Sequence, residues 1–137
     1  YLEGCPHNGP GLDVDADGNV HVTWYTGSED HIGVHYAVSE DGGEHFSASF
    51  HLNTRFKDTP MRAKVVAKNR HTALVACEVI DDDGAQIYLL GPDFSAGSPK
   101  QIEPIAAGSY PNLAQKAGLV ALAWLDGDVV KATLVKM

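Results

Sequence analysis

Hydrophobic and polar residues alternate in short runs along this chain, and glycine, proline and asparagine separate the runs. The alternation is clearest in Val20–Trp24, where every second residue is apolar, and it returns in Val34–Val38. A period of two places the apolar side chains on one face of an extended strand. No stretch of ten or more residues carries a helical period. We therefore predict an all-β fold of short antiparallel strands.

Alignment of the chain with itself gives three repeats, each opened by a proline that precedes a strand. Trp24, Cys77 and Trp124 occupy one matching position in the second strand, at a spacing of about 50 residues. The expected strands are Pro10–Val14, Val20–Trp24 and Val34–Val38 in the first repeat, Pro60–Lys64, Ala73–Cys77 and Gln86–Leu90 in the second, and Pro111–Gln115, Val120–Trp124 and Val130–Leu134 in the third.

A repeat of this length is typical of the four-stranded antiparallel blades of a β-propeller. We predict a single half-propeller domain, 1–137, with blades at 5–54, 58–104 and 109–137. The third repeat ends after its third strand, whereas 1–4 stands where the fourth strand of a preceding blade would lie. We expect this strand, from a second copy or from a missing half of the same polypeptide, to complete the third blade.

The alternation also predicts how the second and third strands of the first repeat pair. If their apolar residues share a face, Trp24 lies opposite Ile32 and Val22 lies opposite Val34. In that register His21 and His35 also lie opposite each other. Two histidines so placed suit a metal ion or a packed, titrating pair, but no third ligand is placed to complete a metal set.

Composition excludes some classes of function. The net charge of −8 and the scattered Lys and Arg argue against nucleic-acid binding. No apolar run approaches the ~20 residues of a membrane-spanning helix. Two cysteines are too few for a disulfide scaffold. Cys5 can be free, disulfide-bonded or a ligand, and Cys77 is expected to be a buried thiol.

The segment Ser39–Phe46 fits the pattern S-x-D-x-G-x-x-F. It resembles the Asp-box, or BNR repeat, of sialidase-like β-propellers, and it stands between the third and fourth strands, where that motif occurs. Ser39 and Asp41 are expected to bond backbone N–H groups of the turn, Gly43 to permit its path, and Phe46 to pack the loop onto the sheet. The resemblance assigns these four residues a structural role.

The start of the first repeat, from Cys5 to Pro10, further resembles blades of bacterial secreted propellers. The resemblance implies the C-terminal half of a secreted or periplasmic protein with six blades. A sialidase also needs three arginines for the sugar carboxylate, a Tyr–Glu nucleophile pair, and an Asp that acts as the acid. Only Arg55, Arg62 and Arg70 are present, and Arg70 falls in a hairpin on the far face. We therefore expect no catalysis by this chain alone.

The propeller topology also predicts which residues face the ligand pocket. We expect His7, Asn8, Arg62 and Tyr110 to bind the ligand, with Arg62 holding an anionic group. Tyr110 either packs beside Pro111 or pairs with Glu103 as a nucleophile and its base. The other residues expected on this face are Lys57, Asp58, Ser109, Glu29, Asp30, His31, Asp81, Asp82, Asp83, Asp126 and Asp128.

Residues 13–18 match the front of a calcium loop, D-x-D-x-D-G, but Trp24 stands where the closing glutamate would be. We interpret the segment as a hairpin turn and expect neither a metal nor a cofactor. The function we predict is binding of a glycan or other small ligand at the propeller mouth. The alternatives are an exo-sialidase completed by a missing half, or a structural half-propeller. The partner expected is a second copy that closes six blades.

Overall fold

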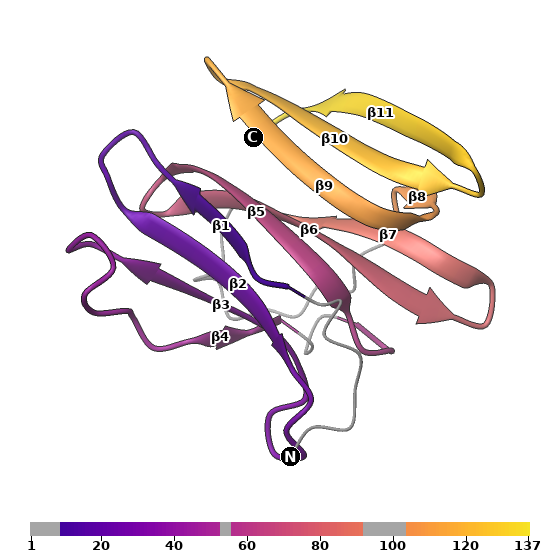
Figure 1. Cartoon of the computed structure of the whole chain (residues 1–137), viewed down its shortest axis with the longest axis horizontal. Helices are drawn as coiled ribbons and strands as arrows, with labels where there is room; N and C mark the ends of the chain where they lie inside the picture. The colour runs from indigo at the N-terminus through magenta and orange to yellow at the C-terminus, as the bar shows by residue number, and fades with distance from the viewer. Residues whose placement is uncertain (1–8, 53–55, 92–103) are drawn as a thin grey trace.

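The computed structural model describes residues 9–52, 56–91 and 104–137, which form three antiparallel sheets (Figure 1). None of the described residues lies in an α-helix, and no helix among them is long and apolar enough to cross a membrane. The strands are β1 (Gly11–Val14), β2 (Val20–Thr26), β3 (Gly33–Ser39), β4 (Phe50–His51), β5 (Met61–Asn69), β6 (Thr72–Asp81), β7 (Gly84–Leu90), β8 (Ala106–Ala107), β9 (Ser109–Lys116), β10 (Leu119–Asp126) and β11 (Val129–Val135).

Each sheet is a meander of strands that are consecutive in the sequence. Sheet one has the order β1-β2-β3-β4, sheet two β5-β6-β7-β8, and sheet three β11-β10-β9. The all-β prediction and its nine strands are confirmed, and the third sheet has three strands, as the repeat suggested. The fourth strand of sheet two, Ala106–Ala107, lies beyond residue 104, where we had ended that repeat. Segment 1–4 lies outside the described residues.

The predicted register of sheet one is wrong. Trp24 pairs with His35 and His21 with Val38, a shift of three residues that moves His21 and His35 to opposite faces. The cause is the connection between β2 and β3, which spans residues 27–32 and includes a turn from His31 N–H to the Ser28 carbonyl at 2.9 Å. The two histidines therefore do not form a pair that could share a metal.

Sheet two is the middle layer, so its strands are buried on both faces. Val65, Val75 and Cys77 pack against sheet one, with Val34 and Tyr36 of β3. The alternate residues pack against sheet three: Val66 and Leu74 lie with Val120, and Ala76 and Ile87 lie with Leu122. Burial on both faces explains the nearly continuous apolar run of β6, and it raises the pKa of the Cys77 thiol well above its ordinary value.

The first strands of the three sheets lie side by side, and one carboxylate links them. Asp13 Oδ2 on β1 accepts the backbone N–H of Ala67 on β5 and the side-chain amide of Gln115 on β9, both at 2.8 Å. The same amide donates to the Ala67 carbonyl at 2.6 Å. This group of three residues connects sheets that are otherwise joined mainly by apolar packing.

The two outer faces of the assembly expose apolar side chains. Leu12 and Val14 stand on sheet one, away from sheet two. On sheet three, Leu119, Val130 and Leu134 lie on the outward face, and Val130 is 71% exposed. Exposed apolar groups that gather on one face are typical of interaction surfaces.

Candidate functional site

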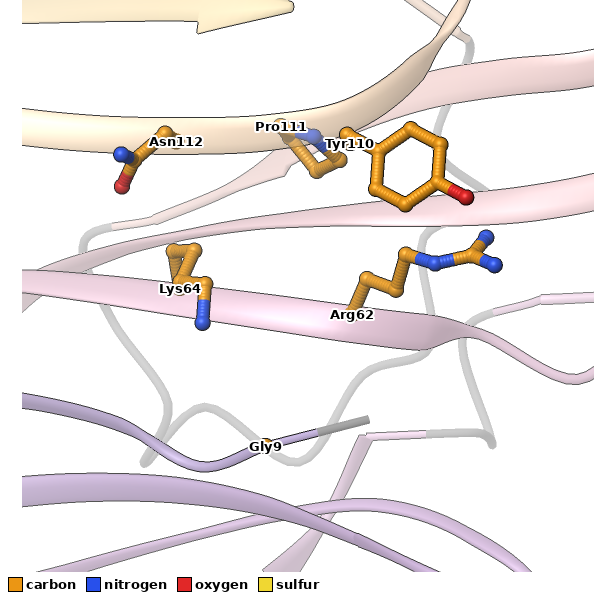
Figure 2. Close-up of a pocket in the computed structure, with 6 residues that line it drawn as sticks. All are labelled: Gly9, Arg62, Lys64, Tyr110, Pro111 and Asn112. Atoms are coloured by element: carbon orange, nitrogen blue, oxygen red, sulfur yellow. The ribbon is translucent and has the colours of Figure 1, made fainter. Parts of the chain in front are cut away.

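The structure brings together Arg62 and Tyr110, which the sequence had singled out separately. The Arg62 guanidinium carbon lies 4.4 Å from the centroid of the Tyr110 ring, a distance at which a cation is attracted to the ring face. Arg62 comes from β5 and Tyr110 from β9, and their side chains extend side by side (Figure 2). The pair therefore spans the junction between sheets two and three.

Glu78 of β6 holds both residues in place. One of its carboxylate oxygens pairs with Arg62, and the other accepts the backbone N–H of Tyr110 at 2.8 Å. The glutamate is only 1% exposed, and a buried charge requires partners of this kind. It reaches Tyr110 because even-numbered residues of β6, such as Leu74 and Ala76, face sheet three.

Both Arg62 and Tyr110 have the left-handed backbone conformation that non-glycine residues rarely adopt. Their φ angles are 52° and 57°. Each lies in an irregularity of strand pairing, between Met61 and Lys64 on β5 and opposite the Ala123–Leu125 step of β10. A residue in this conformation costs about 1–2 kcal/mol and persists when its surroundings fix it, as often happens at functional sites.

The two strands border an open cavity of about 280 Å³. Figure 2 shows Arg62 and Lys64 coming from β5, and Tyr110 and Asn112 from β9. The tyrosine is 56% exposed, so its ring offers a contact surface. The lining residues are Gly9, Arg62, Lys64, Tyr110, Pro111 and Asn112. Two cations, an aromatic ring and an amide suit a small anionic ligand with polar groups.

Sequence reasoning missed three residues that this site uses, Glu78, Lys64 and Asn112. Glu78 had a usable signal, because it is the only acid within the apolar segment 73–80 of β6, and a lone charge there requires a buried partner. Lys64 lay within a predicted strand and carried no such signal. His7 and Asn8, predicted beside Arg62 and Tyr110, lie outside the described residues, as do Arg55 and Glu103.

Arg70 lies at the other end of β5 from the cavity. It follows the last residue of that strand and pairs with Glu40 at 2.7 Å. Eight residues of extended chain separate it from Arg62, a span of about 26 Å. Glu40 belongs to the turn after β3, so Arg70 and the turn share the far edge of the molecule.

That turn has the hydrogen bonds expected of an Asp-box. Ser39 Oγ accepts the N–H of Gly43 at 2.9 Å, and Asp41 Oδ1 accepts the N–H of His45 at 2.9 Å. The bond from the His45 N–H, one from the His45 ring at 2.7 Å and one from the Ser39 hydroxyl at 2.8 Å lower the pKa of Asp41 to about 2. Phe46, which was expected to pack the loop onto the sheet, is 47% exposed, so the packing is partial.

Asp41 and His45, together with Glu44, also bring ligand atoms within 4.8 Å of one another. All three residues are exposed, and Asp41 and His45 are already bonded to each other. Exposed acidic groups of this kind are common without an ion. Asp41 and His45 thus bond to each other within the turn.

The calcium-like segment forms the β1–β2 hairpin. Asp15 Oδ1 accepts the N–H groups of Asp17 and Asn19 at 2.9 Å, while Oδ2 accepts the Asn19 amide at 2.8 Å and lies 3.2 Å from His21 Nε2. Burial alone would raise the pKa of Asp15, but these hydrogen bonds outweigh it and lower the pKa. Both oxygens of the Asp15 carboxylate thus accept hydrogen bonds within the hairpin, which favours a structural role.

His21 continues this buried network to Tyr36. Its Nδ1 lies 2.6 Å from the tyrosine hydroxyl. Burial, and then the charge of Asp15, raises the pKa of Tyr36 to about 12. His35, on the opposite face, stacks between Trp24 and His51 with ring centroids 5.4 and 4.6 Å away. The two histidines thus take part in separate packing arrangements.

Comparison with known proteins adds no relative. No protein-family profile matches the sequence, no curated protein matches it, and no solved structure matches the fold. The candidate function therefore follows from the chemistry of the cavity and its supporting residues.

Proposed function

We propose that this chain binds a small carboxylated ligand, of the sugar-acid class, in the cavity between β5 and β9. The observation that carries the proposal is the gathering of Arg62 and Lys64 of β5 with Tyr110 and Asn112 of β9 in the lining of one cavity. A carboxylate forms charge-assisted hydrogen bonds with both cations. The exposed tyrosine ring and the amide then suit the apolar face and the hydroxyl groups of a sugar.

Glu78 preorganises this site for binding. Its ion pair with Arg62 and its bond to the Tyr110 backbone fix both residues before a ligand arrives. A group that is already positioned loses less conformational freedom on binding, so more of the interaction energy appears as affinity. The carboxylate of Glu78 also offsets one of the two cationic charges, which leaves the pocket with one net positive charge.

The proposal is binding rather than catalysis. Among the described residues, Arg62 is the one arginine that lines the cavity, whereas the exo-sialidase alternative requires three. That alternative would depend on residues supplied by a further half of the protein. The resemblance of Ser39–Phe46 to an Asp-box supports a secreted or periplasmic location as part of the same proposal.

We also propose that the three sheets are blades of a six-bladed, sialidase-like propeller closed by a second copy of the chain. Three features support this proposal: the meandering sheets, the adjacent first strands, and the exposed apolar faces at both ends of the row. A two-fold arrangement would cover Leu12 and Val14 of one copy with Leu119 and Val130 of the other. Light scattering at micromolar concentration tests it, and a stable monomer would contradict closure.

The binding proposal is tested by calorimetric titration of N-acetylneuraminate into the wild-type chain and into Lys64→Gln. Lys64 is preferred to Arg62 for the main variant, because removal of Arg62 would leave Glu78 buried without its cation and endanger folding. We expect Lys64→Gln to weaken binding about tenfold, the loss of one charge-assisted hydrogen bond. The matched control Lys68→Gln should bind as wild type, since Lys68 does not line the cavity. Equal affinity in all three proteins would contradict the assignment.

A further inference from the structure

Two hairpins beside the cavity are rich in acidic residues. The β6–β7 hairpin turns at residues 82–83, and the β10–β11 hairpin turns at 127–128. Both turns lie on one side of the molecule (Figure 1). We call their five carboxylates the acidic rim; they are Asp81, Asp82, Asp83, Asp126 and Asp128.

The acidic rim lies close to the cavity because it continues the strands that hold the site. Asp81 follows Glu78 by three residues on β6, a distance of about 10 Å. Asp126 follows Leu125, whose partner on β9 is Ser109, the neighbour of Tyr110. Asp81 therefore lies within about one Debye length of Glu78 at 0.1 M salt.

The charges of the rim are only partly balanced. Lys57 lies 3.7 Å from Asp82, and Lys131 pairs with Asp126, so the hairpins with these two lysines carry three net negative charges. The cavity carries one net positive charge, from Arg62 and Lys64 together with Glu78. The single negative charge of a monoanion is attracted by Arg62 and Lys64. Each further negative charge on a ligand is repelled by the acidic rim.

We infer that the acidic rim makes the cavity selective for monoanions over dianions and polyanions. This inference rests on the proposed function, because it concerns the charge of the ligand that the cavity takes. The contact with Arg62 and Lys64 supplies the attraction at short range, while the rim acts at long range through solvent. Salt weakens the long-range part most, so the selectivity falls as ionic strength rises.

Gluconate and glucarate are a matched pair of probes. They share one carbon chain, and glucarate has a second carboxylate where gluconate has a hydroxymethyl group. The three net negative charges of the rim, at about 10 Å in water, repel the second carboxylate of glucarate, and the net positive charge of the cavity offsets part of this repulsion. We therefore expect glucarate to bind about twofold to fivefold more weakly than gluconate at 10 mM ionic strength. At 0.5 M the difference should fall below about 1.5-fold. Both dissociation constants can be measured by NMR titration of the full chain.

The variant Asp83→Asn/Asp128→Asn removes two charges of the rim from exposed positions, and should remove most of the preference. The control Asp17→Asn/Glu44→Gln makes the same change in net charge in turns remote from the cavity, and should retain it. Equal or tighter binding of glucarate by wild type at 10 mM, or loss of the preference in the control, would overturn the inference. Failure of both sugar acids to bind either wild type or the rim variant would overturn the proposed function itself.

Discussion

Asp13 offers the sharpest test of how the three sheets are held together. Asp13 belongs to β1, and its Oδ2 accepts hydrogen bonds from β5 and from β9. The substitution Asp13→Ala removes this acceptor without touching the apolar clusters between the sheets. A large loss of stability would show that the polar link matters beside apolar packing.

The magnitude follows from the groups left behind. Ala67 is 1% exposed, so its backbone N–H loses its acceptor in a place that water scarcely reaches, at a cost of about 1–3 kcal/mol. The bond from Gln115 to the carboxylate is also lost, although its amide retains the Ala67 carbonyl. Together we expect Asp13→Ala to lower the free energy of unfolding by about 2–4 kcal/mol, a large part of the total for a domain of this size.

Urea denaturation followed by tryptophan fluorescence measures this effect in two places. Trp24 reports on sheet one and Trp124 on sheet three, so Trp→Phe variants at each position isolate the other probe. We expect coincident transitions in wild type and a parallel loss in Asp13→Ala. Asp17→Ala is the control, because that residue lies in the β1–β2 turn and its substitution should cost at most about 0.5 kcal/mol. An Asp13→Ala effect no larger than this would refute the reasoning.

Three further predictions concern other parts of the chain. The pKa of Asp41 is about 2 in the fold against 3.8 in the unfolded chain, so its contribution to stability is present above about pH 4 and disappears as pH falls to 2. Asp41→Asn should therefore reduce the dependence of the free energy of unfolding on pH in that window, and Glu44→Gln should not. Ala117 has a φ of 50° in the β9–β10 turn, so Ala117→Gly should raise stability by about 0.5–1 kcal/mol in urea titrations, whereas Ala16→Gly should not. Turnover of a fluorogenic sialoside by the purified chain should be undetectable, and measurable release would instead support the exo-sialidase alternative.

The sequence was sufficient to predict strands because strand formation depends on local alternation and turn residues. The register of β2 with β3 was not predictable in the same way, since it depends on how many residues the connection 27–32 takes up. Phe46 shows a related limit: a motif fixes the hydrogen bonds of its turn, but the burial of its aromatic residue depends on neighbouring structure.

The candidate site could be predicted only in part for a similar reason. Arg62 and Tyr110 were recognisable as residues near strand starts, yet their contact requires irregular pairing in two strands that are 48 residues apart. Glu78, which joins them, lies on the face of β6 that sheet three covers, and sheet three comes later in the sequence. Such a site results from the packing of sheets, which no local pattern in the chain describes.

The most direct test of the central proposal is an NMR titration of the full chain with N-acetylneuraminate, observing the Arg62 guanidinium and the Tyr110 ring. The proposal predicts saturable shifts at both groups, with the largest changes confined to residues that line the cavity. In Lys64→Gln the same shifts should require about tenfold more ligand. Shifts that cluster elsewhere, or none at these two side chains up to high millimolar ligand, would contradict it.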